Sequence, residues 1–235
     1  MELEAWQPWY KKIVKKLELD ARTDATAPQI FEQILAHAKI EKLAELVKGK
    51  ECIIFGAGPS LDEDLEKIST GGKTLITADG ATSAVIKYHT PDIIVTDLDG
   101  KIDDQLEAWK QGAWLVIHAH GDNIGKIRET VPQVKKRIIG TTQLEPFGKL
   151  YNFGGFTDGD RAAFMAHELG ASKIILAGMD LGKEIGQWSG EKDEKKKIAK
   201  LEICGELLTW LSRDLGANIV NLTSGGEDIP GIERD

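Results

Sequence analysis

Short apolar runs alternate with amphipathic stretches along most of this chain, and this alternation constrains its fold more than any other feature. The apolar runs are nearly continuous, which is typical of strands buried on both faces of a sheet. Seven strands are expected, at Cys52–Phe55, Thr74–Thr77, Ile93–Val95, Trp114–Ile117, Arg137–Ile139, Lys173–Ala177 and Asn218–Val220.

Helical patterns fall between these strands, because the apolar residues there recur at the spacing of one helix face. The expected helices are Asp62–Ile68, Ala81–Tyr88, Ile102–Gln111, Asn123–Thr130, Gly159–Leu169 and Asp193–Leu215. This order predicts an α/β fold, with a mostly parallel sheet covered by helices on both faces. The run Lys195–Lys197 is interpreted as a solvated face of the last helix.

The first 48 residues follow a different pattern, with apolar residues at helical spacing from Trp6 to Leu46. Asp20 to Pro28 is expected to break the helical pattern and to supply capping residues. His37 is expected within a helix. We therefore expect a helical N-terminal appendage at residues 1–48, followed by an α/β domain at 49–235. The appendage either covers the functional site or mediates a homodimer. The helical spacing of its apolar residues fits both roles.

Composition excludes several classes of protein. The formal net charge of −8 argues against nucleic acid as the main partner, because phosphate backbones favour clustered Lys and Arg. No apolar run approaches the roughly 20 residues that span a bilayer, and no secretory h-region is expected at the start of the chain. The two cysteines, Cys52 and Cys204, are far apart and are expected to be buried, reduced thiols. A cytoplasmic protein is the simplest interpretation.

Glycines and carboxylates follow almost every expected strand, at the edge where parallel sheets bind ligands. The turn Gly56–Ser60 joins a strand to a helix, so its N–H groups could face a phosphate; a tight turn without a ligand is the alternative. The turn also resembles the start of a dinucleotide-binding fingerprint, with Asp79 at the position of the ribose-binding acid. Leu61 occupies the place of the third glycine, so an NAD(P)-binding protein remains a rival interpretation.

Asp97 and Asp99 stand two residues apart just after a strand, and Gly100 follows them. Carboxylates in this arrangement can bind a hard cation such as Mg²⁺, which often takes one or two carboxylates together with water and substrate phosphates. The alternative is a turn with two solvated aspartates. The neighbouring acidic loops favour a metal site.

Two further loops carry polar groups to the same edge. The sequence His118-Ala-His120-Gly-Asp122-Asn123 lacks a further set of zinc ligands, and its imidazoles could orient phosphates, support a metal or hydrogen-bond a heterocycle. In Thr157-Asp158-Gly-Asp160-Arg161, capping explains only part of the motif.

One more loop, after the sixth strand, adds two charged residues. Asp180 and Lys183 follow that strand, and the lysine either meets phosphates or forms a surface ion pair.

The combination of motifs resembles a known group of enzymes. Ala78–Ala81 and Pro91–Asp99 look like the signature of thiamine pyrophosphokinases. The sequence is more similar to the archaeal 6-hydroxymethyl-7,8-dihydropterin pyrophosphokinases, which have a similar fold. The motifs that carry this resemblance are GAGPSL at 56–61, TDLDG at 96–100, HAHGDN at 118–123, GFTDGDRA at 155–162 and GMDLG at 178–182.

The resemblance covers about residues 50–222, and it implies a thiamine-pyrophosphokinase-like catalytic domain that uses ATP and Mg²⁺. It implies an archaeal transferase that passes diphosphate to the hydroxymethyl pterin and releases AMP, in folate or methanopterin biosynthesis. The chain departs from the thiamine enzymes by having Asp180-Leu181-Gly182 where they carry GGRxDH. Thiamine pyrophosphokinase, a non-catalytic nucleotide sensor and flagellar glycosyltransferase-associated proteins stay as alternatives, beside the NAD(P)-binding interpretation.

The resemblance and the loop positions together assign roles to the polar residues. The metal ligands are Asp79, Asp97 and Asp99. The catalytic residues are Asp97, Asp99, Asp122 and Asp158, and a base would come from Asp122, Asp158 or the His118–His120 loop. The nucleotide-binding residues are Gly56, Gly58, Pro59, Ser60, Asp79, Gly80 and Lys183. The acceptor-binding residues are His118, His120, Asn123, Thr157, Asp160 and Asp180.

Overall fold

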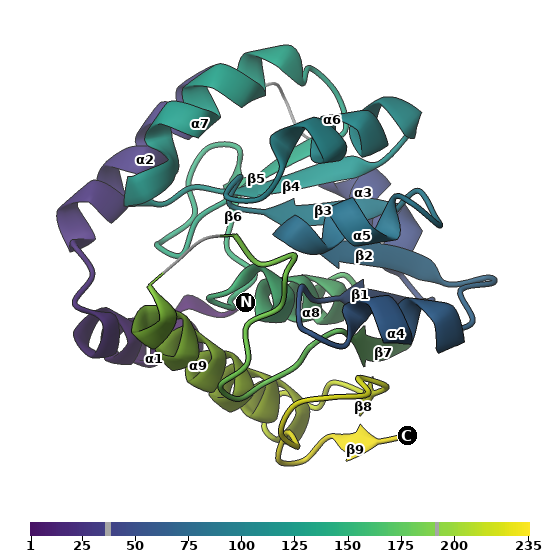
Figure 1. Ribbon diagram of the computed structural model, residues 1–235. Coiled ribbons are helices and arrows are strands. Elements are labelled where there is room, and N and C mark those ends of the chain that lie inside the picture. Colours follow the sequence, from purple (N-terminus) through teal and green to yellow (C-terminus); the bar gives the residue numbers. More distant parts are fainter. Residues whose placement is uncertain (36–38, 191–192) are drawn as a thin grey trace.

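All strands in the described part of the chain belong to one parallel sheet (Figure 1). The structure is a computed structural model that describes residues 1–35, 39–190 and 193–235. The strands are β1 (Glu51–Phe55), β2 (Thr74–Ala78), β3 (Ile93–Thr96), β4 (Trp114–His118), β5 (Ile138–Thr141), β6 (Leu150–Tyr151), β7 (Lys173–Ala177), β8 (Ile219–Asn221) and β9 (Glu233–Arg234). No helix in the described ranges is long and apolar enough to cross a bilayer.

The order of the strands places a reversal near the centre of the sheet. The order is β6-β5-β4-β3-β2-β1-β7-β8-β9. From β1 the chain adds strands outward to β6, and then it returns to place β7 on the other side of β1, with Ile54 opposite Leu176. Open α/β sheets bind ligands beyond the carboxyl ends of the strands at such a reversal.

Helices cover both faces of the sheet, because neighbouring strand residues point to opposite sides. Ile54 joins a core with α1, α3, α8 and α9 on one face, and Ile53 joins a core with α4 and α5 on the other. A third core, around Ile94, adds α2, α6 and α7 to this second face. The α-helices are α1 (Leu3–Leu17), α2 (Ala21–Ile34), α3 (Ile40–Val47), α4 (Leu61–Lys67), α5 (Thr82–Val85), α6 (Ile102–Gln111), α7 (Ile124–Thr130), α8 (Asp158–Glu168) and α9 (Glu194–Arg213).

The predicted α/β class, the parallel sheet and the double helical cover are confirmed. All seven expected strands are present. The structure adds β6 and β9, which are two residues long each and too short to leave a recognisable apolar run in the sequence. The expected helix Ala81–Tyr88 is shorter than predicted. A 3₁₀ turn, η1 (Asp79–Ala81), leads into α5, which ends at Val85. Two other 3₁₀ turns, η2 (Gly121–Asn123) and η3 (Val131–Gln133), flank α7.

The N-terminal segment is helical as expected, but the predicted break at Asp20–Pro28 is wrong beyond its first residue. Asp20 caps α2 by accepting a hydrogen bond from the Arg22 N–H, and the helix then continues through Pro28. Burial of Ala27 and Phe31 in the core with α7 outweighs the weak helix propensity of the Asp20–Pro28 segment. His37 lies outside the described residues. In Figure 1, α2 runs beside α7, while α1 lies beside α9 on the other face.

The docking of α1 depends on Trp6, which is fully buried and donates from Nε1 to the Gln143 carbonyl at 2.8 Å. We expect Trp6→Ala to lower the free energy of unfolding by about 3–5 kcal/mol, because it removes a large buried side chain and leaves a cavity. Chemical denaturation measures this loss. The control is Tyr88→Ala, at a side chain that is 54% exposed, with an expected change within about 0.5 kcal/mol. A Trp6→Ala loss as small as that of the control would contradict a docked α1.

Candidate functional site

The loops that follow β1 and β7 meet at the reversal of the sheet. Gly56 and Gly58 lie against the backbone of Gly178, and a Cβ atom at Gly58 would overlap the carbonyl oxygen of Gly178 and Oδ2 of Asp180. The glycines are therefore required by close packing of two backbones. The Gly56 and Gly58 N–H groups donate to the carbonyls of Ala177 and Gly178 at 2.9 and 2.8 Å. These two N–H groups are engaged within the protein, so the turn contributes shape to the site.

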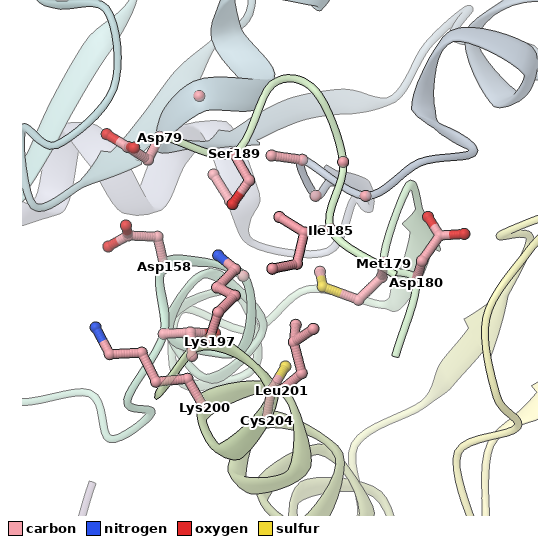
Figure 2. Close-up of a pocket in the computed structure, with 18 of the residues that line it drawn as sticks. Asp79, Asp158, Met179, Asp180, Ile185, Ser189, Lys197, Lys200, Leu201 and Cys204 are labelled. Carbon is pink, nitrogen blue, oxygen red and sulfur yellow. The ribbon is translucent and has the colours of Figure 1, made fainter. Parts of the chain in front are cut away.

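A cleft of about 110 Å³ opens beyond these loops (Figure 2). Its floor comes from the two glycine loops and from η1, and α9 forms one wall with Lys197, Lys200, Leu201 and Cys204. Residues 184–190 cross above the floor. Gln187 and Trp188 both donate to Oδ2 of Asp62, at 2.7 and 2.9 Å, which fastens this crossing segment to α4. We call this cleft the first cavity.

Three carboxylates gather at one end of the first cavity. Asp79, Asp97 and Asp158 each place an oxygen within 4.8 Å of the others. Asp79 begins η1 after β2, Asp97 follows β3, and Asp158 begins α8. Figure 2 shows the carboxylates of Asp79 and Asp158 at the same end of the cavity, with Lys197 beside them. Hard carboxylate oxygens at this separation suit a divalent cation such as Mg²⁺.

Asp79 is held firmly by hydrogen bonds from the described residues to its Oδ1. Its backbone has a φ of +42°, a left-handed conformation that Asp tolerates better than most residues. Oδ1 accepts hydrogen bonds from Thr96 Oγ1, Gly100 N and Gln105 Nε2 at 2.7, 3.0 and 2.9 Å. Burial raises the pKa of Asp79, and the charge of Asp97 raises it further. The three donors orient the carboxylate, while none of them is a cation that would neutralise it.

Asp99, the second predicted acid after β3, points to a different partner. Its Oδ1 accepts a hydrogen bond from Lys126 Nζ at 3.0 Å, so the two residues form an ion pair. Asp99 is not a member of the carboxylate cluster, whereas Asp158 is. The structure thus brings together two of the three predicted metal ligands and adds Asp158 to them.

Two predicted acceptor-binding residues serve as supports below the surface of the site. Asp160 is fully buried and accepts hydrogen bonds from the Phe156 N–H and the Thr157 hydroxyl, at 3.0 and 2.6 Å. Asn123 is also fully buried and donates to the carbonyls of Asp97 and His118 at 2.8 and 2.6 Å. Both side chains fix the loops that carry the cluster, and neither lines the first cavity or the second cavity described below.

The remaining predicted residues divide between the floor and the surface. Ser60 donates from its N–H and its hydroxyl to Oδ2 of Asp180, at 3.2 and 2.8 Å, and burial raises the pKa of Asp180. Asp180 lines the first cavity at the end away from the carboxylate cluster (Figure 2). Pro59 and Lys183 are exposed and do not line the first cavity, whereas Gly80 lies on its floor.

A second cavity of about 150 Å³ lies on the far side of the cluster. Asp97, Phe156 and Lys200 line both cavities and so mark the boundary between them. His118, His120 and Asp122 of the loop after β4 line this second cavity, as does Arg161 of α8. Its outer wall comes from the N-terminal segment, through Glu18, Leu19, Asp20, Thr23 and Asp24.

Sequence reasoning missed several of these lining residues. The interpretation of Lys195–Lys197 as a solvated face is wrong for Lys197, which lines the first cavity. Lys197, Lys200, Leu201 and Cys204 share one face of α9 by their spacing, and this mixed polar and apolar stripe is a signal that could have found them. Asp24 and Gln143 carried no such signal, because α2 and the loop after β5 meet only in the tertiary structure.

Comparisons with known proteins identify a family for this chain. Residues 29–186 match the model of a family described as 6-hydroxymethylpterin diphosphokinase MptE-like. Relatives named 6-hydroxymethyl-7,8-dihydropterin pyrophosphokinase come from three archaea. That of Methanothermobacter thermautotrophicus is 42% identical, with 91% of this chain and 97% of the relative aligned. The relative from Pyrococcus furiosus is 42% identical, with 95% of this chain and 100% of the relative aligned. The relative from Methanocaldococcus jannaschii is 37% identical, with 90% of this chain and 96% of the relative aligned.

The raised pKa of Asp79 leads to a prediction about stability without metal. As the pH rises above the ordinary Asp value, the unfolded chain loses this proton before the folded chain does, so folding becomes less favourable until the raised pKa is passed. Asp79→Asn keeps an oxygen for the three donors and removes the charge. We expect it to raise the midpoint of thermal unfolding in EDTA at pH 7, by roughly 2–4 °C for each kcal/mol of relieved repulsion.

The matched control for this measurement is Asp103→Asn on α6, at an exposed side chain outside both cavities, where we expect no gain. A lower midpoint for Asp79→Asn than for the unchanged chain would mean that the charge supports the fold.

Proposed function

Because the chain belongs to the MptE-like 6-hydroxymethylpterin diphosphokinase family, we propose that it transfers diphosphate from ATP to 6-hydroxymethyl-7,8-dihydropterin. AMP is the other product, and the pterin diphosphate would serve as a precursor for folate or methanopterin. The observation that carries the proposal is the cluster of Asp79, Asp97 and Asp158 at the boundary of two cavities. Two substrates that must meet at one phosphorus atom need such a boundary.

The carboxylate cluster would hold Mg²⁺ in this proposal. Asp79, Asp97 and Asp158 supply oxygen ligands of the kind that Mg²⁺ prefers, and their negative charge is concentrated in a small volume. When bound, the ion would offset phosphate charge and order the triphosphate. Asp79 is fixed for this role by the three donors to its Oδ1.

The first cavity would take the nucleotide. It lies at the reversal of the sheet, where its floor of glycine backbone allows a ligand to approach closely. Lys197 and Lys200 on α9 bring positive charge to the wall beside the cluster, which suits the β- and γ-phosphates. The acceptor would then enter from the second cavity, across the boundary formed by Asp97, Phe156 and Lys200.

The transfer itself forms one bond and breaks one. The hydroxymethyl oxygen of the acceptor bonds to the β-phosphorus of ATP, and the bond from that phosphorus to the oxygen bridging to the α-phosphorus breaks, so that AMP leaves with that oxygen. The hydroxyl proton passes to a base. The candidates are Asp158, which belongs to the cluster, and Asp122, which lines the second cavity. In a loose transition state, positioning and charge compensation contribute more than the base does.

Product analysis tests the reaction and the acceptor together. With ATP and Mg²⁺, we expect AMP to accumulate when 6-hydroxymethyl-7,8-dihydropterin is present and not when thiamine replaces it. Separation of the nucleotides by chromatography, with detection of the pterin diphosphate, measures both products. AMP formed with thiamine alone would move the protein to the thiamine pathway. ATP that stays intact with either acceptor would favour a nucleotide sensor or, if NADH fluorescence changes, a dinucleotide-binding protein.

Substitutions distinguish the carboxylate cluster from the pair of acids predicted from the sequence. We expect Asp158→Asn to lower kcat by about 100-fold or more, because a metal ligand is lost. We expect Asp99→Asn, which removes the partner of Lys126, to lower kcat by less than about 10-fold, consistent with a surface ion pair.

Binding of Mn²⁺, measured by electron paramagnetic resonance, should weaken for Asp158→Asn and stay near that of the unchanged chain for Asp99→Asn, with Asp103→Asn as the exposed control. The reverse order of effects would return the metal site to Asp97 and Asp99.

A further inference from the structure

The second cavity contains a buried polar atom that the rest of the described protein leaves without a partner. His118 is 2% exposed, lies at the end of β4 and lines this cavity. Its Nε2 has no hydrogen-bond partner among the described residues. Buried polar atoms in this state are rare in folded proteins, because desolvation without a bond is unfavourable. The atom is therefore available to a ligand that enters the cavity, as is Nε2 of His120 beside it.

The hydrogen bonds on the other side of the imidazole ring determine what that ligand must offer. Nδ1 of His118 lies 3.0 Å from Thr141 Oγ1, and the same hydroxyl donates to the Ile117 carbonyl at 3.3 Å. We assign the single hydrogen of this hydroxyl to the Ile117 carbonyl, and with this assignment Nδ1 is the donor in the first bond. In the neutral ring Nε2 is then an acceptor. Burial lowers the pKa of His118 well below its ordinary value, and the charges of Arg161 and His120 lower it further, which favours the neutral ring, while Asp97 and the Gln143 side chain act in the opposite direction.

The turn between α1 and α2 and the first turn of α2 line the same cavity as His118. Asp24 of α2 is 7% exposed and receives hydrogen bonds from Tyr10 Oη, Gln143 Nε2 and Gly121 N, at 3.1, 2.6 and 3.0 Å. These donors come from α1, from the loop after β5 and from η2, so one carboxylate joins three walls of the cavity. The N-terminal segment is therefore part of the site, although residues 1–28 lie outside the matched family model.

We propose that the second cavity is the subsite for the acceptor heterocycle and that Nε2 of His118 accepts a hydrogen bond from an N–H group of its ring system. The ligand class is a planar heterocycle with N–H donors along one edge, such as a dihydropterin. This inference rests on the proposed function, since it assigns one substrate of that reaction. It places the hydroxymethyl group toward Asp97, at the boundary with the first cavity.

Two substitutions at His118 distinguish the hydrogen-bond acceptor at Nε2 from the structural contact that Nδ1 makes with Thr141. Asn places its amide at the position of Nδ1, so it keeps a donor for Thr141 and loses the group at Nε2. Gln reaches the position of Nε2 and can restore an acceptor there. With 6-hydroxymethylpterin as a fluorescent probe and no ATP present, we expect His118→Asn to raise its Kd by about 3- to 10-fold, the value of one neutral hydrogen bond. His118→Gln should stay near the unchanged chain.

The Kd for ATP should stay constant in both variants, and His89→Asn, at an exposed histidine outside both cavities, is the control. Equal pterin affinity for His118→Asn and the unchanged chain, or equal losses for Asn and Gln, would overturn the proposal. The unchanged chain is assayed for AMP release in parallel. AMP release with the pterin, combined with unaltered binding by His118→Asn, removes only this inference, whereas no AMP release with the pterin removes the proposed function as well.

Discussion

The parallel pairing of β1 with β7 is the constraint on which the rest of the site depends. These strands are far apart in sequence, and their pairing brings Gly56 and Gly58 against Gly178 at the centre of the sheet. Any side chain at these glycines would push the two loops apart. Because the backbones touch, the following segments diverge from one point, and the space between them becomes the first cavity. The strands on either side then add their own loops along the same edge, so that three carboxylates from β2, β3 and α8 can meet.

Electrostatics sets this cluster apart from an ordinary acidic surface. Asp79 is oriented by two neutral side chains and one backbone N–H. Arg161 forms an ion pair with Asp158 of the same cluster at 3.0 Å, whereas Lys126 pairs with Asp99 outside it. The folded chain thus keeps a raised pKa at Asp79 beside the charge of Asp97. Groups placed in this way reduce stability unless a cation joins them, and such arrangements are concentrated at functional sites.

The sequence predicted the fold class and most strands because buried parallel strands leave continuous apolar runs that require no tertiary information. It placed Asp79 and Asp97 at the ligand-binding edge of the sheet because both follow such strands directly. It missed the role of Asp24 because a capped helix at Ala21–Ile34 has weak local signals, and burial of Phe31 decides it. The direction of a side chain was equally inaccessible: Asp97 and Asp99 have similar local sequences, yet Asp97 faces the cluster while Asp99 faces Lys126. Only the packed loops distinguish them.

The N-terminal helices show how the packing of the fold shapes the second cavity. Their apolar residues enter two of the three cores, so the segment docks by the same hydrophobic burial that stabilises the α/β body. Docking brings Asp24 within hydrogen-bonding distance of Gly121 and Gln143, and these bonds hold the loop after β4 in place. That loop carries His120, whose Nε2 lies 3.6 Å from Asp97. A change in the docked helices therefore reaches the carboxylate cluster through one short series of contacts, which makes the segment a structural part of the second cavity.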